Sequence, residues 1–109
     1  MPSPTLDDDG ESVTLDLHGA TVHEALVLTR DVLRVADRRG RAEVTLVHGH
    51  STSDVQGHSR TIKNELRRLV ERGDFDHVVR GVRRDRGRLV LKLNLTGRSN
   101  PKRLQLQDL

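Results

Sequence analysis

The stretch Leu15-Asp16-Leu17-His18-Gly19 decides the fold, because it closes an alternating apolar run and leads at once into helix-forming sequence. From Ser12 to Leu17, apolar residues alternate with polar ones, as in a β-strand that buries one face. Asp16 and His18 therefore share the opposite face, two residues apart. A carboxylate beside an imidazole can fix the tautomer of the ring and raise its basicity, and both groups can bind a divalent cation.

A second polar stretch, Val47-His48-Gly49-His50, closes the next apolar run. Between the two stretches, Thr21 and Glu24 have the spacing of a helix capping box, and an apolar helical stripe extends to Gly40. Right-handed crossover connections make the two strands of such a unit parallel, and neighbouring parallel strands end at the same edge of the sheet. The sequence thus predicts that His18 and His48 lie at one edge.

The remainder of the chain predicts one more helix and two more strands. The helix spans about residues 59–72, a strand follows at 78–82, and the turn Asp85-Arg86-Gly87 leads into a last alternating strand at 89–95. The predicted order is βαβαββ. We therefore expect an α/β fold, a two-layer α/β sandwich with a mixed four-stranded sheet and both helices on one face.

The two ends of the chain differ in composition from its middle. Residues 1–11 contain four acids and no Lys or Arg, which predicts a flexible acidic N-terminal arm. Residues 12–97 form the expected domain, since 109 residues suffice for a single core. Residues 98–109 form a polar C-terminal tail, in which Leu104 and Leu106 could add a short strand or a helix turn.

Composition excludes several classes of protein. The chain has no cysteine, so it has no disulfide framework and no thiolate metal site. It has no apolar run of about 18 residues, as a membrane span requires, and no signal-peptide pattern. We expect a cytoplasmic protein that does not bind membranes, with a monomer as the default state.

Charge and aromatic content point to a polyanion as partner. The formal net charge is +3, and Lys and Arg far outnumber Asp and Glu between Arg60 and Arg103. Phe75 is the only aromatic residue apart from histidine, so bases cannot stack on a set of aromatic platforms. Recognition of the phosphate backbone by shape fits this composition. The alternative reading of the charge is a solvated surface in an arginine-rich protein.

The two polar stretches, together with Thr61-Ile62-Lys63-Asn64-Glu65-Leu66, resemble the small MutS-related (Smr) domain family over about residues 13–95. The first stretch matches the LDLHG-type motif of that family. The second matches only the start of its HGxG-type loop, because His50-Ser51-Thr52 follows here. The late double glycine of the family is also missing.

The resemblance implies a nucleic-acid-binding domain that cleaves structured DNA or RNA as an endonuclease. It implies Asp16, His18 and His48 as catalytic residues. The residues expected to bind the nucleic acid are Gly49, His50, Ser51, Arg60, Lys63, Arg67 and Lys92. Cleavage with a divalent ion, Mg²⁺ or Mn²⁺, and metal-free cleavage of RNA through its own 2′-OH both remain open.

Two other functions stay open on the sequence alone. The altered second motif suggests a non-catalytic module that binds nucleic acid, or a ribosomal or repair complex. The histidines suggest a metal-binding protein, although no zinc spacing such as His-Glu-x-x-His occurs.

Overall fold

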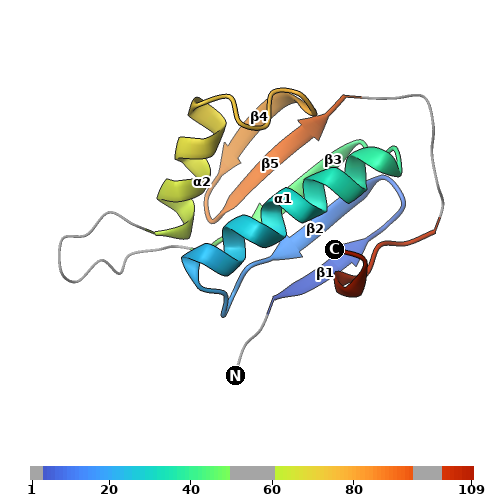
Figure 1. Cartoon of the computed structure of the whole chain (residues 1–109), viewed down its shortest axis with the longest axis horizontal. Coiled ribbons are helices and arrows are strands. Elements are labelled where there is room, and N and C mark those ends of the chain that lie inside the picture. The colour runs from blue at the N-terminus through green and yellow to red at the C-terminus, as the bar shows by residue number, and fades with distance from the viewer. Residues whose placement is uncertain (1–3, 50–60, 95–101) are drawn as a thin grey trace.

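The computed structural model describes residues 4–49, 61–94 and 102–109, which form a five-stranded sheet with two helices on one face (Figure 1). In chain order the elements are β1 (Thr5–Asp8), β2 (Ser12–Asp16), α1 (Val22–Arg38), β3 (Glu43–Val47), α2 (Ile62–Glu71), β4 (Val79–Asp85), β5 (Arg88–Leu93) and the 3-10 turn η1 (Leu106–Asp108). The strand order is β1-β2-β3-β5-β4, in which β2 and β3 are parallel and the other neighbours antiparallel. The predicted α/β fold is confirmed, with one strand more than expected.

Helix α1 begins at the predicted capping box. The Thr21 hydroxyl accepts the Glu24 N–H at 3.1 Å, and the Glu24 carboxylate accepts the Thr21 N–H at 2.9 Å. These bonds satisfy N–H groups that have no partner inside the helix. The helix then crosses back over the sheet, so that β3 starts beside β2 and runs parallel to it (Figure 1). Neither α1 nor α2 is long and apolar enough to span a membrane, and these are the α-helices of the described part of the chain.

One hydrophobic core lies between the helices and the sheet. β3 contributes Val44 and Leu46 from the middle of the sheet, which explains why this strand is apolar. Alternating residues of the flanking strands and the inner faces of both helices complete the cluster: Val13, Leu15, Leu17, Ala25, Val32, Leu33, Ala36, Leu66, Leu69, Phe75, Leu89, Leu91 and Leu93. The alternation predicted for residues 12–17 is therefore confirmed. In the predicted last strand Leu89, Leu91 and Leu93 are buried as expected, but Val90 on the other face is also buried, and residue 95 lies outside the described part of the chain.

The N-terminal segment forms part of the sheet. β1 pairs antiparallel with β2, and its last residue, Asp8, is only 3% exposed. Asp8 accepts hydrogen bonds from the fully buried Arg41, with Arg41 Nε 2.9 Å from Oδ1 and Nη2 2.9 Å from Oδ2. The expectation of a flexible acidic arm is thus wrong for residues 5–8. The edge of β2 offers free backbone groups to pair with, and Arg41 neutralises the acid that enters the core.

The C-terminal segment packs against the same ion pair. The Leu104 N–H donates to Asp8 Oδ2 at 2.7 Å, and Arg41 Nη2 donates to the Lys102 carbonyl at 2.8 Å. Leu104 itself is 3% exposed and belongs to the core. The expected polar tail is therefore corrected over residues 102–109, where Leu104, the partly buried Leu109 and two backbone groups join the domain.

Candidate functional site

The end of β2 holds Asp16 and His18 in direct contact. Leu17, between them, points into the core and is 1% exposed, which turns its two neighbours toward the opposite side of the sheet. Asp16 Oδ1 accepts the His18 backbone N–H at 2.9 Å and lies 2.5 Å from His18 Nδ1. Since a carboxylate only accepts, Nδ1 carries a proton and the ring keeps Nε2 as the nitrogen that can exchange protons in the neutral form.

The Asp16 carboxyl stays ionised in this arrangement. Partial burial acts to raise its pKa, but the hydrogen bonds from the His18 backbone and ring, together with the charge of that ring, outweigh the burial. The pKa of Asp16 is therefore held below its ordinary value. The residue can orient the imidazole over the whole neutral and mildly acidic range.

The end of β3 brings His48 and Gly49 to the same edge. Asp16 is level with Val47 in the parallel register, and the Leu17 N–H donates to the Val47 carbonyl at 2.9 Å. A Cβ at Gly49 would lie 3.4 Å from His18 Nε2, so the two motifs touch through that ring nitrogen. The predicted convergence of the two strand ends is what the structure shows.

The turn between β4 and β5 supports the second motif. The Gly87 carbonyl accepts the N–H groups of both His48 and Gly49, each at 3.0 Å. His48 Nδ1 lies 2.8 Å from the Gly49 carbonyl, an acceptor, which places a proton on Nδ1. The hairpin thus holds the backbone that carries His48, and the turn predicted at Asp85-Arg86-Gly87 gains a role that its sequence alone does not reveal.

A small cavity of about 120 Å³ adjoins His48, between α2 and the β4–β5 hairpin. It is lined by two of the cations expected to bind nucleic acid, Lys63 and Arg67 of α2. It is also lined by Arg84 and Arg88, which sequence reasoning missed. In the sequence, Arg84 and Arg88 can be seen to lie on either side of the hairpin turn. Their approach to Lys63 and Arg67 becomes visible only in the structure, where α2 and the hairpin line the same cavity.

The other expected nucleic-acid-binding residues do not join this group. Lys92 pairs with Glu43 across β3 and β5, and lies between two core-facing leucines. It is therefore on the helix-free face of the sheet, away from Lys63 and Arg67. His50, Ser51 and Arg60 lie outside the described residues.

The described residues do not provide a preformed metal centre. Within residues 4–49, 61–94 and 102–109, no group of three His, Asp or Glu side chains is placed to hold one ion. Asp16, His18 and His48 thus share an edge without forming a three-ligand cluster. Asp16 is the one carboxylate among them, the kind of oxygen ligand that Mg²⁺ and Mn²⁺ prefer.

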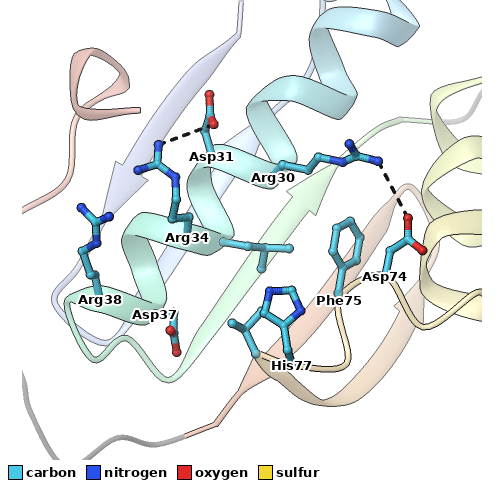
Figure 2. Close-up of a pocket in the computed structure, with 10 residues that line it drawn as sticks. Arg30, Asp31, Arg34, Asp37, Arg38, Asp74, Phe75 and His77 are labelled. Atoms are coloured by element: carbon cyan, nitrogen blue, oxygen red, sulfur yellow. Dashed lines mark ion pairs between the residues drawn. The ribbon is translucent and has the colours of Figure 1, made fainter.

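A larger cavity, of about 710 Å³, lies between α1 and the segment that follows α2 (Figure 2). Four of its charged residues form two ion pairs: Arg30 reaches Asp74 at 3.8 Å, and Arg34 lies 3.6 Å from Asp31. It is lined by the second half of α1, which ends at the opposite end of the domain from the end of β2 (Figure 1). By size alone this cavity would be the first candidate for the functional site. The paired carboxylate and imidazole, however, lie at the ends of β2 and β3, and we take those strand ends as the candidate site.

Comparison with known proteins agrees with this fold. The crystal structure of the Smr domain of Thermus thermophilus MutS2 is similar, with a TM-score of 0.57 and 24% identity, and the match covers 77% of this chain and 98% of that one. A search of curated proteins gives no match. The family model of the Smr domain matches residues 15–88, from the first motif to the start of β5 and more than half of the chain. The chain therefore belongs to the Smr domain family.

Proposed function

We propose that this Smr domain binds structured DNA or RNA and cleaves its phosphodiester backbone at the edge formed by β2 and β3. The observation that carries the proposal is the contact between Asp16 and His18 Nδ1. The other ring nitrogen of His18, Nε2, lies beside Gly49 of the second motif. Smr domains generally bind nucleic acids and are nuclease-like, which supports the same function.

The two histidines suit an acid and a base of one reaction. His18 Nε2 accepts the proton of the attacking hydroxyl, either water or the 2′-OH of RNA, while Asp16 holds the ring and stabilises its charge. The attacking oxygen forms a bond to phosphorus, the bond to the leaving oxygen breaks, and a protonated His48 supplies the proton that this oxygen needs. A positioned imidazole contributes about 10²- to 10⁴-fold in rate.

Recognition in this proposal rests on phosphates and not on bases. The chain has no Trp or Tyr, and its single Phe, Phe75, is 5% exposed and packs in the core. No exposed Phe, Tyr or Trp is therefore offered for base stacking, which is the usual means of reading single strands. Contacts to phosphate fix the position of a duplex without reading its sequence, so we expect preference for shape.

The proposed reaction is written without a divalent ion, and the cleavage experiment below tests whether one is required. Asp16 is the carboxylate that would help to hold Mg²⁺ or Mn²⁺, and such an ion would supply charge stabilisation at the phosphate. Because the described residues do not form a three-ligand centre, each step above is assigned to the side chains of this chain.

The experiment is a combined binding and cleavage screen of the full chain. Labelled duplex RNA, hairpin RNA and branched DNA are incubated with EDTA, Mg²⁺ or Mn²⁺, and products are separated on denaturing gels while affinity is measured by filter binding. We expect salt-dependent binding and cleavage of at least one substrate. Absence of binding to every substrate at low salt would overturn the proposal.

The second candidate is a non-catalytic nucleic-acid-binding module. The observation that favours it is the sequence His50-Ser51-Thr52 after the second motif, where family members continue with a basic residue or His and then Gly. Binding without cleavage under all three ionic conditions would favour this function. Stabilisation by Zn²⁺ alone, with no binding of nucleic acid, would instead favour a metal-binding protein.

A further inference from the structure

The cavity beside His48 is a cluster of positive charge that the reaction above does not use. We name it the α2–hairpin pocket and define it by Lys63, Arg67, Arg84 and Arg88, with His48 at one side. Leu66 and Leu89 supply its apolar lining, and both are almost completely buried. The one acid in the lining, Asp85, lies 3.1 Å from Arg83 Nε and so has a partner of its own.

The four cations outnumber the single acid in the lining, Asp85. Lys63 and Arg67 are four residues apart on α2, a spacing at which like charges repel across one turn of helix. Among the residues that the structure describes, no acid forms an ion pair with Lys63, Arg67 or Arg88, and Arg84 reaches Glu71 only at 4.0 Å. An anion seated between them would relieve this repulsion.

The volume of the pocket limits what the anion can be. Its 120 Å³ is well below the roughly 300–1,000 Å³ of cavities that bury a drug-sized ligand. A compact tetrahedral anion matches this volume better than a nucleoside does. Guanidinium groups, which offer paired N–H donors, match the oxygens of a phosphate.

We propose that the α2–hairpin pocket binds one phosphate group of the sugar–phosphate backbone, beside the phosphate that is attacked at the histidines. This inference rests on the proposed function and adds to it a binding subsite. The link is His48: this residue lines the pocket, and its backbone N–H donates to the carbonyl of Gly87 in the same hairpin. A phosphate in the pocket would thus fix the position of the backbone relative to both imidazoles.

The first experiment uses inorganic phosphate as the probe. Backbone amide shifts are followed by NMR during a titration with phosphate, against chloride at constant ionic strength. For the wild type we expect saturable shifts at His48, Gly49 and Gly87. For Arg67→Gln we expect affinity at least about tenfold weaker, because a charge-assisted contact is lost.

The matched control is Arg68→Gln, the same change at the next position of α2. Arg68 lies 3.8 Å from Glu65 and does not line the pocket, so this variant should bind phosphate as the wild type does. Circular dichroism spectra of both variants serve as the control for correct folding. Shifts that remain linear in the wild type, or equal losses in the two variants, would overturn the proposal.

The second experiment tests whether the pocket binds an internal or a terminal phosphate of the nucleic acid. It also distinguishes failure of this proposal from failure of the proposed function. The same oligonucleotide is bound with a 5′-hydroxyl and with a 5′-phosphate at several salt concentrations. We expect equal affinities for both, and a salt slope that falls by about one in Arg67→Gln but not in Arg68→Gln. Tighter binding of the 5′-phosphate would overturn the assignment to an internal phosphate. Saturable phosphate binding by a domain that binds no oligonucleotide would sustain the pocket and overturn the proposed function.

Discussion

At the scale of single residues, Gly49 is the position where the two motifs constrain each other. Its φ of +73° is a conformation that residues with a Cβ rarely adopt, and a Cβ there would lie in van der Waals contact with His18 Nε2, at 3.4 Å. Glycine is therefore needed for the turn of the backbone, and a methyl group added there would lie against the imidazole.

We expect Gly49→Ala to lower the free energy of unfolding by about 1–3 kcal/mol because of its backbone conformation, and to place a methyl group against the His18 ring. Gly10→Ala is the matched control, because Gly10 has a φ of +98° but no atom within 4 Å of the added Cβ. Urea denaturation should show a loss in both variants. Imidazole NMR shifts should change only in Gly49→Ala, and unchanged His18 shifts there would contradict the contact.

Asp16 and His18 were predictable from the sequence because alternation along a strand is a local property. Leu15 and Leu17 face the core, so the residues that alternate with them must share the other side. Arg84 and Arg88 were not predictable as part of a site. Their meeting with Lys63 depends on how α2 lies against a hairpin that follows it in the chain, and no local pattern encodes that contact.

At the scale of elements, the β4–β5 hairpin and α2 form the basic side of the candidate site. The hairpin holds His48 and Gly49 through the Gly87 carbonyl, and α2 supplies Lys63 and Arg67 beside it. Lys92 comes from the same hairpin but points to the helix-free face. From the sequence we expect Lys63, Arg67 and Lys92 to bind the same nucleic acid. In the structure Lys92 lies on the other face of the sheet from Lys63 and Arg67.

We expect Lys63→Gln to weaken binding of nucleic acid and to reduce the salt slope by about one. Lys92→Gln removes the same charge from the other face and should leave the slope close to that of the wild type. Filter binding at four or five salt concentrations measures both. A larger loss in Lys92→Gln than in Lys63→Gln would move the binding surface to the helix-free face.

At the scale of the whole molecule, the buried pair of Asp8 and Arg41 joins the two ends of the chain to the domain. Asp8 also accepts the Leu104 N–H, so β1 and the C-terminal segment depend on one carboxylate. Both segments lie outside the part matched by the family model, residues 15–88. The acidic composition of residues 1–11 predicts a flexible arm, but Asp8 has a partner 33 residues away in sequence, which that composition does not reveal.

We expect Asp8→Asn to lower the free energy of unfolding by about 3–5 kcal/mol at pH 7, since it leaves Arg41 charged and buried without its counter-ion. Asp7→Asn, at the exposed neighbouring position, should cost little. Urea denaturation at neutral pH compares the two variants. Equal small losses would show that the buried pair does not stabilise the fold.

The same pair predicts how stability depends on pH. Burial acts to raise the pKa of Asp8, but hydrogen bonds from Arg41, Leu104 and Gly10 and the charge of Arg41 outweigh it and hold the pKa below its ordinary value. The stabilisation is therefore complete above the unfolded pKa of about 3.9 and is lost as pH falls through the folded pKa. The difference between wild type and Asp8→Asn should shrink below about pH 4. A difference that grows on acidification would contradict this sign.

The central claim is that His18, oriented by Asp16, carries out phosphodiester cleavage at this edge of the sheet. Its most direct test is the single-turnover cleavage rate of the wild type, His18→Ala and the control His77→Ala, in which the removed imidazole lies at the distant cavity. We expect His18→Ala to lose about 10²- to 10⁴-fold in rate with binding little changed, and His77→Ala to cleave normally. Cleavage by folded His18→Ala at the wild-type rate would contradict the account.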